Sequence, residues 1–237
     1  MMQELQKNAE VFGLSLSAKA LAQFETYWDY LSEQNQIMDL TAITERAEAV
    51  EKHFLDSLAL TQAADFTGKR LIDIGTGAGF PGLPLKLAVP TLEVTLLDSL
   101  QKRVIFLEEL TTRLKLEGVQ TVHGRAEEWI STPGEREGYD YAVSRAVAEL
   151  RMLLELCLPY VKVGGAFLAM KTLRAEGEIQ EAAGALKILG GDIEVYHDYT
   201  LPGSPEVQRR IVVIRKVSAT PEGYPRRFAR IQKKPLE

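Results

Sequence analysis

The sequence predicts an α/β fold built on a mostly parallel β-sheet, and three observations lead to this class. Short apolar runs alternate with helical segments between residues 69 and 189, which is the pattern of βαβ units. A glycine cluster follows the first apolar run, at the point where a strand leads into a helix. The last two apolar runs are separated only by turn-forming residues 201–205, so we expect them to pair as an antiparallel hairpin.

Length and composition set limits on the kind of protein. The chain has 237 residues, of which 46% are hydrophobic and 26% charged, so a disordered chain is excluded. The single cysteine, Cys157, allows no internal disulfide, and nothing requires an oxidising compartment. Residues 1–10 lack the basic and apolar pattern of a secretory signal, and no apolar run reaches the roughly 18 residues of a membrane span. We therefore expect a cytoplasmic protein without membrane contacts.

Residues 1–66 are expected to form a helical extension. Apolar residues recur at helical spacing in two stretches, Leu21/Phe24/Trp28/Leu31 and Val50/Phe54/Leu55/Leu58. Ser17 and Thr44 are the predicted N-caps of these two helices.

Residues 67–217 are expected to form the α/β core, followed by a basic tail at 218–237. Five parallel strands are predicted at 70–74, 93–97, 119–123, 139–144 and 165–170. The helical segments between and after them are 83–88, 101–117, 126–130, 150–160 and 175–189. The terminal hairpin is predicted from strands 193–200 and 210–216, which completes a seven-stranded sheet.

The glycine loop, residues 73–82, is the strongest local signal of a ligand site. In open α/β sheets, ligands bind beyond the carboxyl ends of the strands, and glycines allow the backbone to approach them closely. The dinucleotide pattern Gly-x-Gly-x-x-Gly is not met, because Phe80 occupies its third glycine position. Asp73, at the strand end, would repel a pyrophosphate and suits a cationic ligand.

A second acid, Asp98, ends the next predicted strand. A carboxylate in this position can accept hydrogen bonds from both ribose hydroxyls of an adenosine-type ligand. The third strand leads to Gly124-Arg125-Ala126-Glu127, whose backbone amides could recognise an adenine edge. This order of features suits S-adenosylmethionine better than a dinucleotide, although the glycines could also form only a tight turn.

Several longer segments identify a family. The chain resembles the bacterial 16S ribosomal RNA guanine-7 methyltransferase G family (RsmG, also called GidB). The matching segments are Leu40–Thr44, Lys52–Leu58, Asp73–Gly82, Leu97–Leu100, Lys102-Arg103, Gly124–Glu127, Ser144–Ala148, Gly164-Gly165, Met170-Lys171 and Tyr224–Arg227. The sequence departs from the common family pattern at Asp39, at Thr172 and at Phe228-Ala229-Arg230.

The resemblance implies a Rossmann-like, S-adenosylmethionine-dependent methyltransferase fold and assigns roles to individual residues. It implies that the cofactor is bound by Gly75, Gly77, Phe80, Asp98, Ser99, Leu100, Ala126, Glu127 and Arg145. It implies that Arg145 and Lys171 are the catalytic residues, with Arg145 at the end of the fourth strand beside the transferred methyl group and Lys171 at the end of the fifth strand, facing the same crevice. The implied reaction is methylation of ring nitrogen 7 of a guanine in small-subunit ribosomal RNA.

The residue chemistry agrees with this reaction. Guanine N7 has a free lone pair and no proton to lose, so no general base is needed and catalysis rests on positioning. The fourth strand is followed by Ser144-Arg145-Ala146 rather than by the Asn/Asp-Pro-Pro-aromatic segment of amino-group methyltransferases. Cys157 lies in an apolar stretch and is expected to be a core residue rather than a nucleophile. No carboxylates with metal-ligand spacing occur, so no metal is expected.

Some assignments stay open between two roles. Arg145 could reach the target guanine or its phosphate, or it could pair with Glu149 four residues on. Lys171 could face the same crevice or be a solvated lysine. His53 and Asp56 share a helix face, and a structural contact between the helical extension and the sheet is favoured over a catalytic pair. His123 is expected to line the cofactor rim.

Charge is distributed unevenly along the chain. The net charge is −5, but residues 209–237 contain nine basic and two acidic residues, so this stretch is +7 and residues 1–208 carry −12. A solvated basic terminus is one explanation, and contact with RNA phosphates is the other. With the resemblance, we expect Arg226, Arg227, Arg230, Lys233 and Lys234 to bind the RNA backbone. Removing residues from Gly223 onward is expected to weaken RNA binding and leave cofactor affinity near normal.

We therefore expect a monomeric enzyme whose partner is small-subunit ribosomal RNA or the 30S particle. A small-molecule methyltransferase is the enzymatic alternative, and it would carry a closed apolar lid. A cofactor-sensing protein that binds the ribosome without turnover is the non-enzymatic alternative.

Overall fold

The computed structural model of the chain describes residues 2–145, 148–173 and 176–237. Ala146 and Val147, from the Ser144–Ala148 segment, and Ala175, the predicted start of a helix, lie outside these ranges. None of the helices in the described ranges combines the length and apolar composition needed to cross a bilayer.

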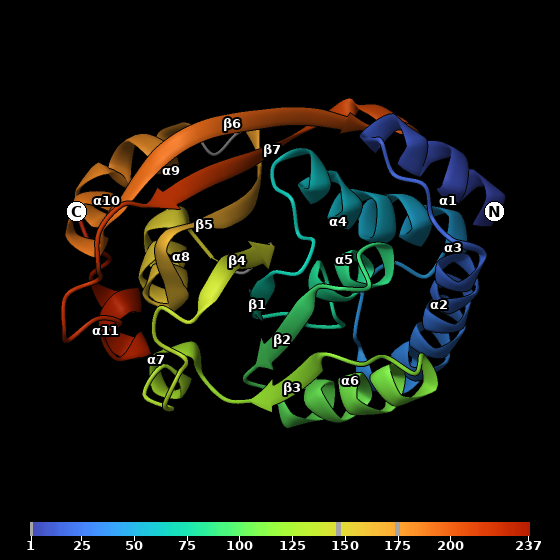
Figure 1. Cartoon of the computed structure of the whole chain (residues 1–237), viewed down its shortest axis with the longest axis horizontal. Helices are drawn as coiled ribbons and strands as arrows, with labels where there is room; N and C mark the ends of the chain where they lie inside the picture. Colours follow the sequence, from blue (N-terminus) through green and yellow to red (C-terminus); the bar gives the residue numbers. More distant parts are fainter. Residues whose placement is uncertain (1, 146–147, 174–175) are drawn as a thin grey trace.

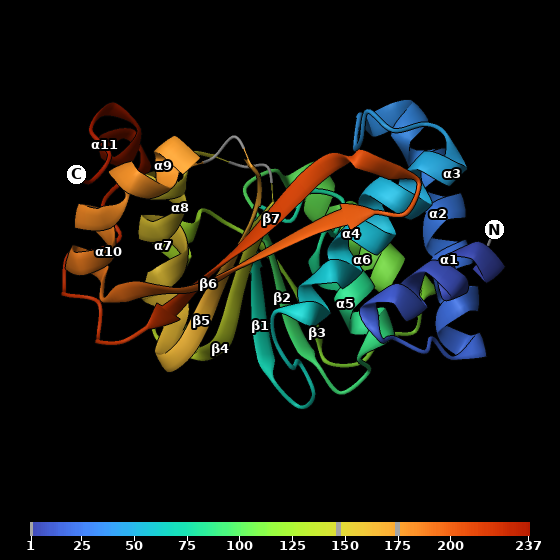
Figure 2. The ribbon, with the colours of Figure 1, turned by 90° about the horizontal axis from the view of Figure 1, so that it is seen from above.

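A seven-stranded sheet forms the centre of the molecule, with helices on both of its faces (Figures 1 and 2). The strand order is β3-β2-β1-β4-β5-β7-β6. The first five strands are parallel, and the hairpin β6–β7 pairs antiparallel to the edge strand β5, as predicted. The strands are β1 (Arg70–Ile74), β2 (Glu93–Asp98), β3 (Val119–His123), β4 (Tyr139–Arg145), β5 (Val161–Thr172), β6 (Gly191–Leu201) and β7 (Ser204–Lys216).

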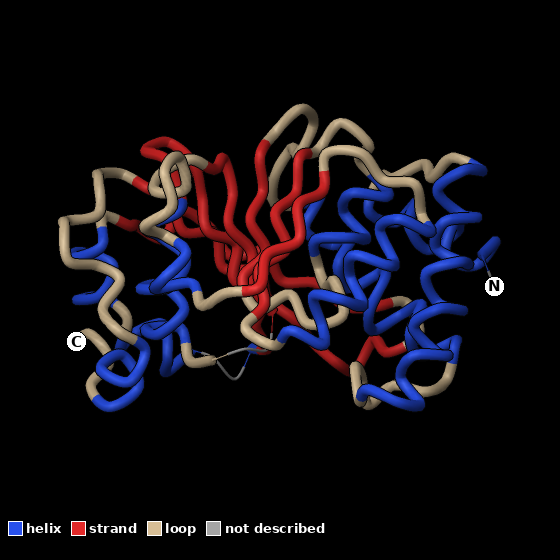
Figure 3. The backbone as a smooth tube through the Cα atoms, turned by 90° about the horizontal axis from the view of Figure 1, so that it is seen from below, coloured by secondary structure: helices blue, strands red, loops and turns tan. Residues whose placement is uncertain are grey.

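The helices separate into two groups along the chain. One face is covered by α1 (Met2–Ala9), α2 (Ala18–Met38), α3 (Arg46–Ala49), α4 (Asp56–Leu58), α5 (Gly82–Ala88) and α6 (Gln101–Arg113). The opposite face carries α7 (Ala126–Trp129), α8 (Leu150–Cys157), α9 (Glu176–Glu181), α10 (Ala183–Leu189) and α11 (Phe228–Lys233). Figure 3 shows the strands as a separate layer between these two groups of helices.

Each face of the sheet has its own core because strand side chains alternate. On β5, Leu168 and Met170 join the core under the N-terminal helices, whereas Phe167 and Ala169 join the core under α8 and α10. Cys157 lies in the second core and is fully buried, as expected, and burial raises the pKa of its thiol. Such a thiol is a packing residue and not a nucleophile.

Some boundaries differ from the sequence-based expectation. Ser17 caps α2 by accepting a hydrogen bond from the Ala20 amide, as predicted, but Thr44 is not a cap, since α3 begins after Glu45. The predicted helix 175–189 is divided into α9 and α10. The predicted helix 101–117 ends at Arg113 because Lys115 has a positive φ of 51° that a helix does not allow.

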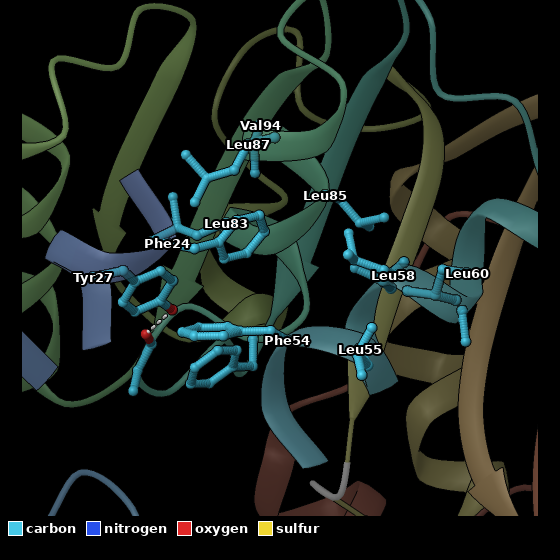
Figure 4. Close-up of a cluster of buried hydrophobic side chains, with 14 of the residues drawn as sticks. Phe24, Tyr27, Phe54, Leu55, Leu58, Leu60, Leu83, Leu85, Leu87 and Val94 are labelled. Atoms are coloured by element: carbon cyan, nitrogen blue, oxygen red, sulfur yellow. Dashed lines mark hydrogen bonds between the residues drawn. The ribbon is translucent and has the colours of Figure 1, made fainter. Parts of the chain in front are cut away.

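The helical extension packs directly onto the glycine loop. Figure 4 shows Phe24, Tyr27 and Phe54 gathered around Leu83 of α5. The Tyr27 hydroxyl donates to the carbonyl of Ala78 at 2.6 Å, and its ring stacks on Phe80 with centroids 5.3 Å apart. The extension therefore fixes the shape of the loop at which the parallel strands end.

Candidate functional site

Two neighbouring cavities, which we call the first and second lobes, lie at the carboxyl ends of the parallel strands. The first lobe, about 460 Å³, is lined by Leu40, Thr41, His53, Gly75, Thr76, Gly77, Ala78, Phe80, Asp98, Ser99, Arg103 and Arg145. The second lobe, about 180 Å³, is lined by Ile74, Gly75, Leu97, Asp98, Ser99, Gly124, Arg125, Ala126, Glu127, Leu156 and Phe228. Gly75, Asp98 and Ser99 line both lobes, so one elongated ligand could extend through them.

The glycine loop has the backbone geometry that its sequence suggests. Gly75 and Gly77 have φ angles of 72° and 61°, in the left-handed region that favours glycine. Gly79 is more constrained: its φ is 101°, and an added Cβ would lie 2.6 Å from both Leu83 and the Tyr27 hydroxyl. The loop is therefore built for close packing against α5 on one side and for close ligand approach on the other.

Asp73 binds the glycine loop and does not face a ligand, contrary to the expectation from its position at the strand end. It is completely buried, and its Oδ2 accepts hydrogen bonds from Thr76 Oγ1 (2.7 Å) and from the Gly82 amide (2.8 Å). Burial raises its pKa to about 7. Asp73 lines neither lobe, so it joins the two ends of the glycine loop instead of facing a cationic ligand.

Asp98 is placed at the junction of the two lobes. It is 3% exposed, and Oδ1 accepts from the Leu100 amide at 2.9 Å. Oδ2 accepts from the Gly77 amide at 2.9 Å and from Arg103 at 3.3 Å. The carboxylate is thus held rigidly, with its position defined by both the glycine loop and the β2–α6 turn.

Arg145 is held by the helical extension and not by Glu149, which pairs with Arg151. Its Nη1 donates to the Lys52 carbonyl (2.9 Å) and to Asp56 Oδ2 (3.1 Å), and its guanidinium lies 5.1 Å from the Phe80 ring centroid. Asp56 is buried and also binds Tyr199 and Arg209 from the terminal hairpin. The side chain of Arg145 therefore enters the first lobe from a fixed network that joins three parts of the chain.

His53 completes this network and is a neutral ring. Arginine only donates, so the contact of 3.2 Å between Arg145 Nη2 and His53 Nδ1 makes Nδ1 the acceptor. The ring proton then lies on Nε2 and is donated to Thr41 Oγ1 at 2.7 Å. Burial, together with the Arg145 charge, lowers the pKa of His53 to about 3. The structural contact expected for this residue is present, and the ring is a poor proton acceptor.

This low pKa predicts acid-sensitive stability. Between pH 6.5 and about 3 the unfolded chain binds a proton at residue 53 that the folded chain does not, so stability is lost as pH falls through this range. When the pH falls from 7 to 5, we expect the unfolding free energy of the wild type to drop. The drop for His53→Gln should be smaller by about 1–2 kcal/mol. Urea denaturation at both pH values measures this, with His197→Gln as the histidine control. Equal losses in wild type and His53→Gln would contradict the prediction.

The two lobes gather most of the predicted cofactor residues but not all of them. Gly75, Gly77, Phe80 and Arg145 line the first lobe, Ala126 and Glu127 line the second, and Asp98 and Ser99 line both. Leu100 lines neither lobe, and it contributes an amide to Asp98. His123 is exposed at the end of β3 and contacts the Ser99 carbonyl at 3.2 Å.

Lys171 is directed elsewhere. Its ammonium group donates to the Ala148 carbonyl at 2.7 Å and pairs with Glu178 of α9 at 2.8 Å. Lys171 lines neither lobe, so the expectation that it faces the crevice is corrected. An acidic partner on α9 was not foreseen because the sequence does not reveal which side chains meet across elements.

The basic C-terminal region is less free than its charge count suggested. Ion pairs engage Arg209, Arg210, Arg215, Lys216 and Arg226. Arg226 binds both carboxylate oxygens of the buried Glu155, at 2.7 and 2.6 Å, so the prediction that it contacts RNA is corrected. The exposed basic residues of α11 and its ends are Arg227, Arg230, Lys233 and Lys234.

Thr41, Arg103 and Phe228 are among the lining residues that were not singled out from the sequence as site residues. Thr41 and Arg103 fall in segments that carry the family resemblance, which was the available signal, and Phe228 falls where the chain departs from it. No local pattern predicts that Phe228 reaches the second lobe, because this contact is made across the fold.

Comparison with known proteins agrees with this architecture. The chain is 48% identical over 225 residues to a ribosomal RNA small subunit methyltransferase G of Lachnoclostridium phytofermentans, covering 94% of this chain and 93% of that protein. It is 47% identical to the protein of the same name from Bacillus licheniformis, covering 95% and 94% of the two chains.

Solved structures share the fold at low identity. A SAM-dependent methyltransferase from Aquifex aeolicus superposes with a TM-score of 0.55 and 15% identity, covering 74% of this chain and 96% of that one. TYW2 of M. jannaschii, solved in complex with AdoMet, gives a TM-score of 0.51 at 14% identity, covering 65% and 71%. The family profile described as rRNA small subunit methyltransferase G matches residues 20–204. The chain therefore belongs to the rRNA small subunit methyltransferase G family.

Proposed function

We propose that the protein uses S-adenosylmethionine to methylate ring nitrogen 7 of a guanine in 16S ribosomal RNA. The observation that carries the proposal is the match to this family over residues 20–204, which includes the glycine loop, Asp98 and Arg145. The described residues that line the two lobes suit this cofactor, and those of the first lobe include no effective general base at neutral pH.

The two neighbouring lobes suit an adenosine attached to a methionine chain. Asp98 has the chemistry to accept hydrogen bonds from ribose hydroxyls, and the second lobe, with Ala126 and Glu127, suits a flat base. Gly75, Gly77 and Phe80 would hold the methionine end in the first lobe, beside Arg145. When bound, the cofactor supplies a methyl group on a positively charged sulfur.

The first lobe is suited to a nucleophile that has no proton to lose. Among the described residues that line it, the only neutral nitrogen base is His53, whose pKa of about 3 makes it ineffective near neutral pH. Asp98, the carboxylate that lines this lobe, is assigned to the ribose of the cofactor and not to the target base. Guanine N7 requires no general base, so the chain's contribution is to hold the base at near-attack distance.

Arg145 is the residue best placed to hold the target nucleotide. Three of its five N–H donors are engaged by Lys52, Asp56 and His53, which leaves donors for an oxygen acceptor in the lobe. Guanine O6 is such an acceptor next to N7, and a phosphate oxygen is another. A base that reaches this depth must leave its stack, which is the usual behaviour of base-modifying enzymes.

The experiment that tests the function follows the methyl group. The protein is incubated with cofactor carrying a tritiated methyl group and with small ribosomal subunits that lack the modification, and the label is then mapped. We expect label on N7 of one guanine of the 16S RNA. Label on a metabolite would favour a small-molecule methyltransferase, and cofactor binding without any transfer would favour a sensing protein; either result would overturn the proposal.

The ribosomal substrate places the proposed activity in the cytoplasm, with either ribosomal RNA or the 30S particle as partner and one protein chain as the active unit. Within the proposal, residues 1–66 support the glycine loop, residues 67–217 bind the cofactor, and residues 218–237 approach the RNA.

The four exposed basic residues of α11 predict a salt effect. Arg227, Arg230 and Lys234 are spaced three and four residues apart, so they share one face of the helix. Each phosphate contact that is lost lowers the slope of log affinity against log salt by roughly 0.7–0.9. We expect replacement of Arg227, Arg230, Lys233 and Lys234 by glutamine to flatten this slope for 16S RNA by roughly 3 and to weaken binding at low salt.

The matched control is Arg215→Gln, which removes a charge that is already paired with Glu194. Its slope should equal that of the wild type. If the fourfold variant also keeps the wild-type slope, α11 does not contact the RNA backbone.

A further inference from the structure

The wall of the second lobe includes an aromatic residue from the far end of the chain. Phe228, the first residue of α11, lines this lobe together with Ala126, Glu127 and Leu156. The other lining residues come from the ends of β1 and β2, from the β3–α7 turn and from α8. The C-terminal segment thus completes a cavity that the α/β core would otherwise leave open at this side.

The segment that carries Phe228 is anchored on both sides. Before it, the Arg226 amide and guanidinium bind Glu155, a side chain of α8 with no exposed surface. After it, Ile231 is fully buried in the core below α8 and α10, and Leu236 is 8% exposed. The carbonyl of Glu237 lies so close to Gly184 of α10 that a Cβ there would be 2.0 Å from it.

A buried Arg–Glu pair is costly unless its geometry is good, and here the guanidinium binds both carboxylate oxygens of Glu155. The charged and apolar contacts together fix the start of α11 against the cavity. Phe228 is therefore not a solvated tail residue, although only nine residues follow it in the sequence.

We propose that Phe228 forms part of the adenine subsite, so that the C-terminal segment belongs to the cofactor site as well as to the RNA-facing surface. The inference rests on the proposed use of S-adenosylmethionine. An adenine ring is flat and largely apolar on its faces, and an aromatic side chain in the wall offers it a large contact area. The Arg125 guanidinium, which lines the same lobe, lies 5.9 Å from the Phe228 ring centroid, at the limit of cation–π range.

A truncated chain would lose more than basic residues. Removal of residues from Gly223 onward takes away Phe228 and the Arg226 anchor along with the four exposed basic residues. Such a truncation is now expected to weaken cofactor binding as well as RNA binding, so single substitutions are the cleaner test.

The test measures binding of S-adenosylhomocysteine, the demethylated product, by isothermal titration calorimetry without RNA. We expect Phe228→Ala to bind it about tenfold more weakly than the wild type, since the contact between the aromatic ring and the base is lost. Phe228→Tyr keeps the ring and should bind within about twofold of the wild type, and Phe228→Leu should fall between the two. Gln232→Ala, an exposed change on the same helix, should bind like the wild type.

Melting temperatures without ligand show whether each variant keeps its fold. Adenosine alone should repeat the loss seen in Phe228→Ala, whereas methionine does not occupy this lobe and should not. If Phe228→Ala binds S-adenosylhomocysteine as tightly as the wild type, the inference is overturned. If the wild type itself does not bind it, the proposed function fails instead, so the two failures are distinguishable.

Discussion

Replacement of Arg145 by alanine is expected to lower the rate of methyl transfer to 16S RNA about a hundredfold, the size of loss seen when one preorganised donor is removed from a site. The Arg145 guanidinium lines the first lobe and is held there by Asp56, a buried carboxylate of the helical extension. Without it, the target guanine keeps its N7 lone pair but loses the group that holds it in line with the transferred methyl group.

The measurement should separate binding from chemistry. Because Arg145 is proposed to hold the nucleotide, the loss should appear in single-turnover rate with saturating cofactor, while affinity for S-adenosylhomocysteine changes by a smaller factor. Arg145→Lys keeps the charge but lacks the planar fork that serves Asp56, His53 and the ligand together, so it should recover only part of the rate.

Stability must be followed in the same variants. Asp56 is 2% exposed, and loss of Arg145 leaves it with Tyr199 and Arg209 as partners, so we expect a lower melting temperature for Arg145→Ala. Arg215→Ala removes an exposed ion pair on the hairpin and should change neither rate nor melting temperature much. A folded Arg145→Ala protein with the wild-type rate would refute the role assigned to this arginine.

The sheet could be predicted from the sequence because its determinants are local. Each parallel strand is a short run that ends in a polar residue or, for β1, is followed by a glycine, and the hairpin is set by Pro202-Gly203 between two apolar runs. The glycine loop and Asp98 are likewise local signals, since both follow directly from a strand end. Ser17 is a cap for the same reason.

The contacts that were missed are made between distant residues. Arg226 meets Glu155 across 71 residues, and Arg145 meets Asp56 across 89. A net-charge count treats every arginine as equally available, whereas burial decides which of them face water. For this reason the +7 of residues 209–237 overstated the free charge, and the wall residue Phe228 was found only from the fold.

Replacement of Asp98 by alanine is expected to weaken S-adenosylhomocysteine binding by at least about a hundredfold, because a hydrogen bond to a charged group is worth about 1.5–3 kcal/mol and two ribose hydroxyls would lose theirs. The same change removes the acceptor for the Gly77 and Leu100 amides, so the loop that surrounds the ligand is also less ordered. Asp98→Asn keeps the shape and one acceptor oxygen, and it should lose only about tenfold.

The ligand can be varied to separate these two causes. An analogue of S-adenosylhomocysteine without the 2′ and 3′ hydroxyls has nothing for Asp98 to accept, so wild type and Asp98→Ala should bind it with nearly equal affinity if the carboxylate recognises the ribose. If Asp98 acts only by ordering the glycine loop, the substitution should weaken the analogue and the full product by the same factor. Asp140→Asn serves as the control. Asp140 lies near the amino end of β4, away from the carboxyl ends that carry the site, and pairs with Lys162, so this substitution should leave both affinities unchanged. An equal loss for both ligands would therefore assign Asp98 to the loop, and a loss confined to the hydroxylated ligand would assign it to the ribose.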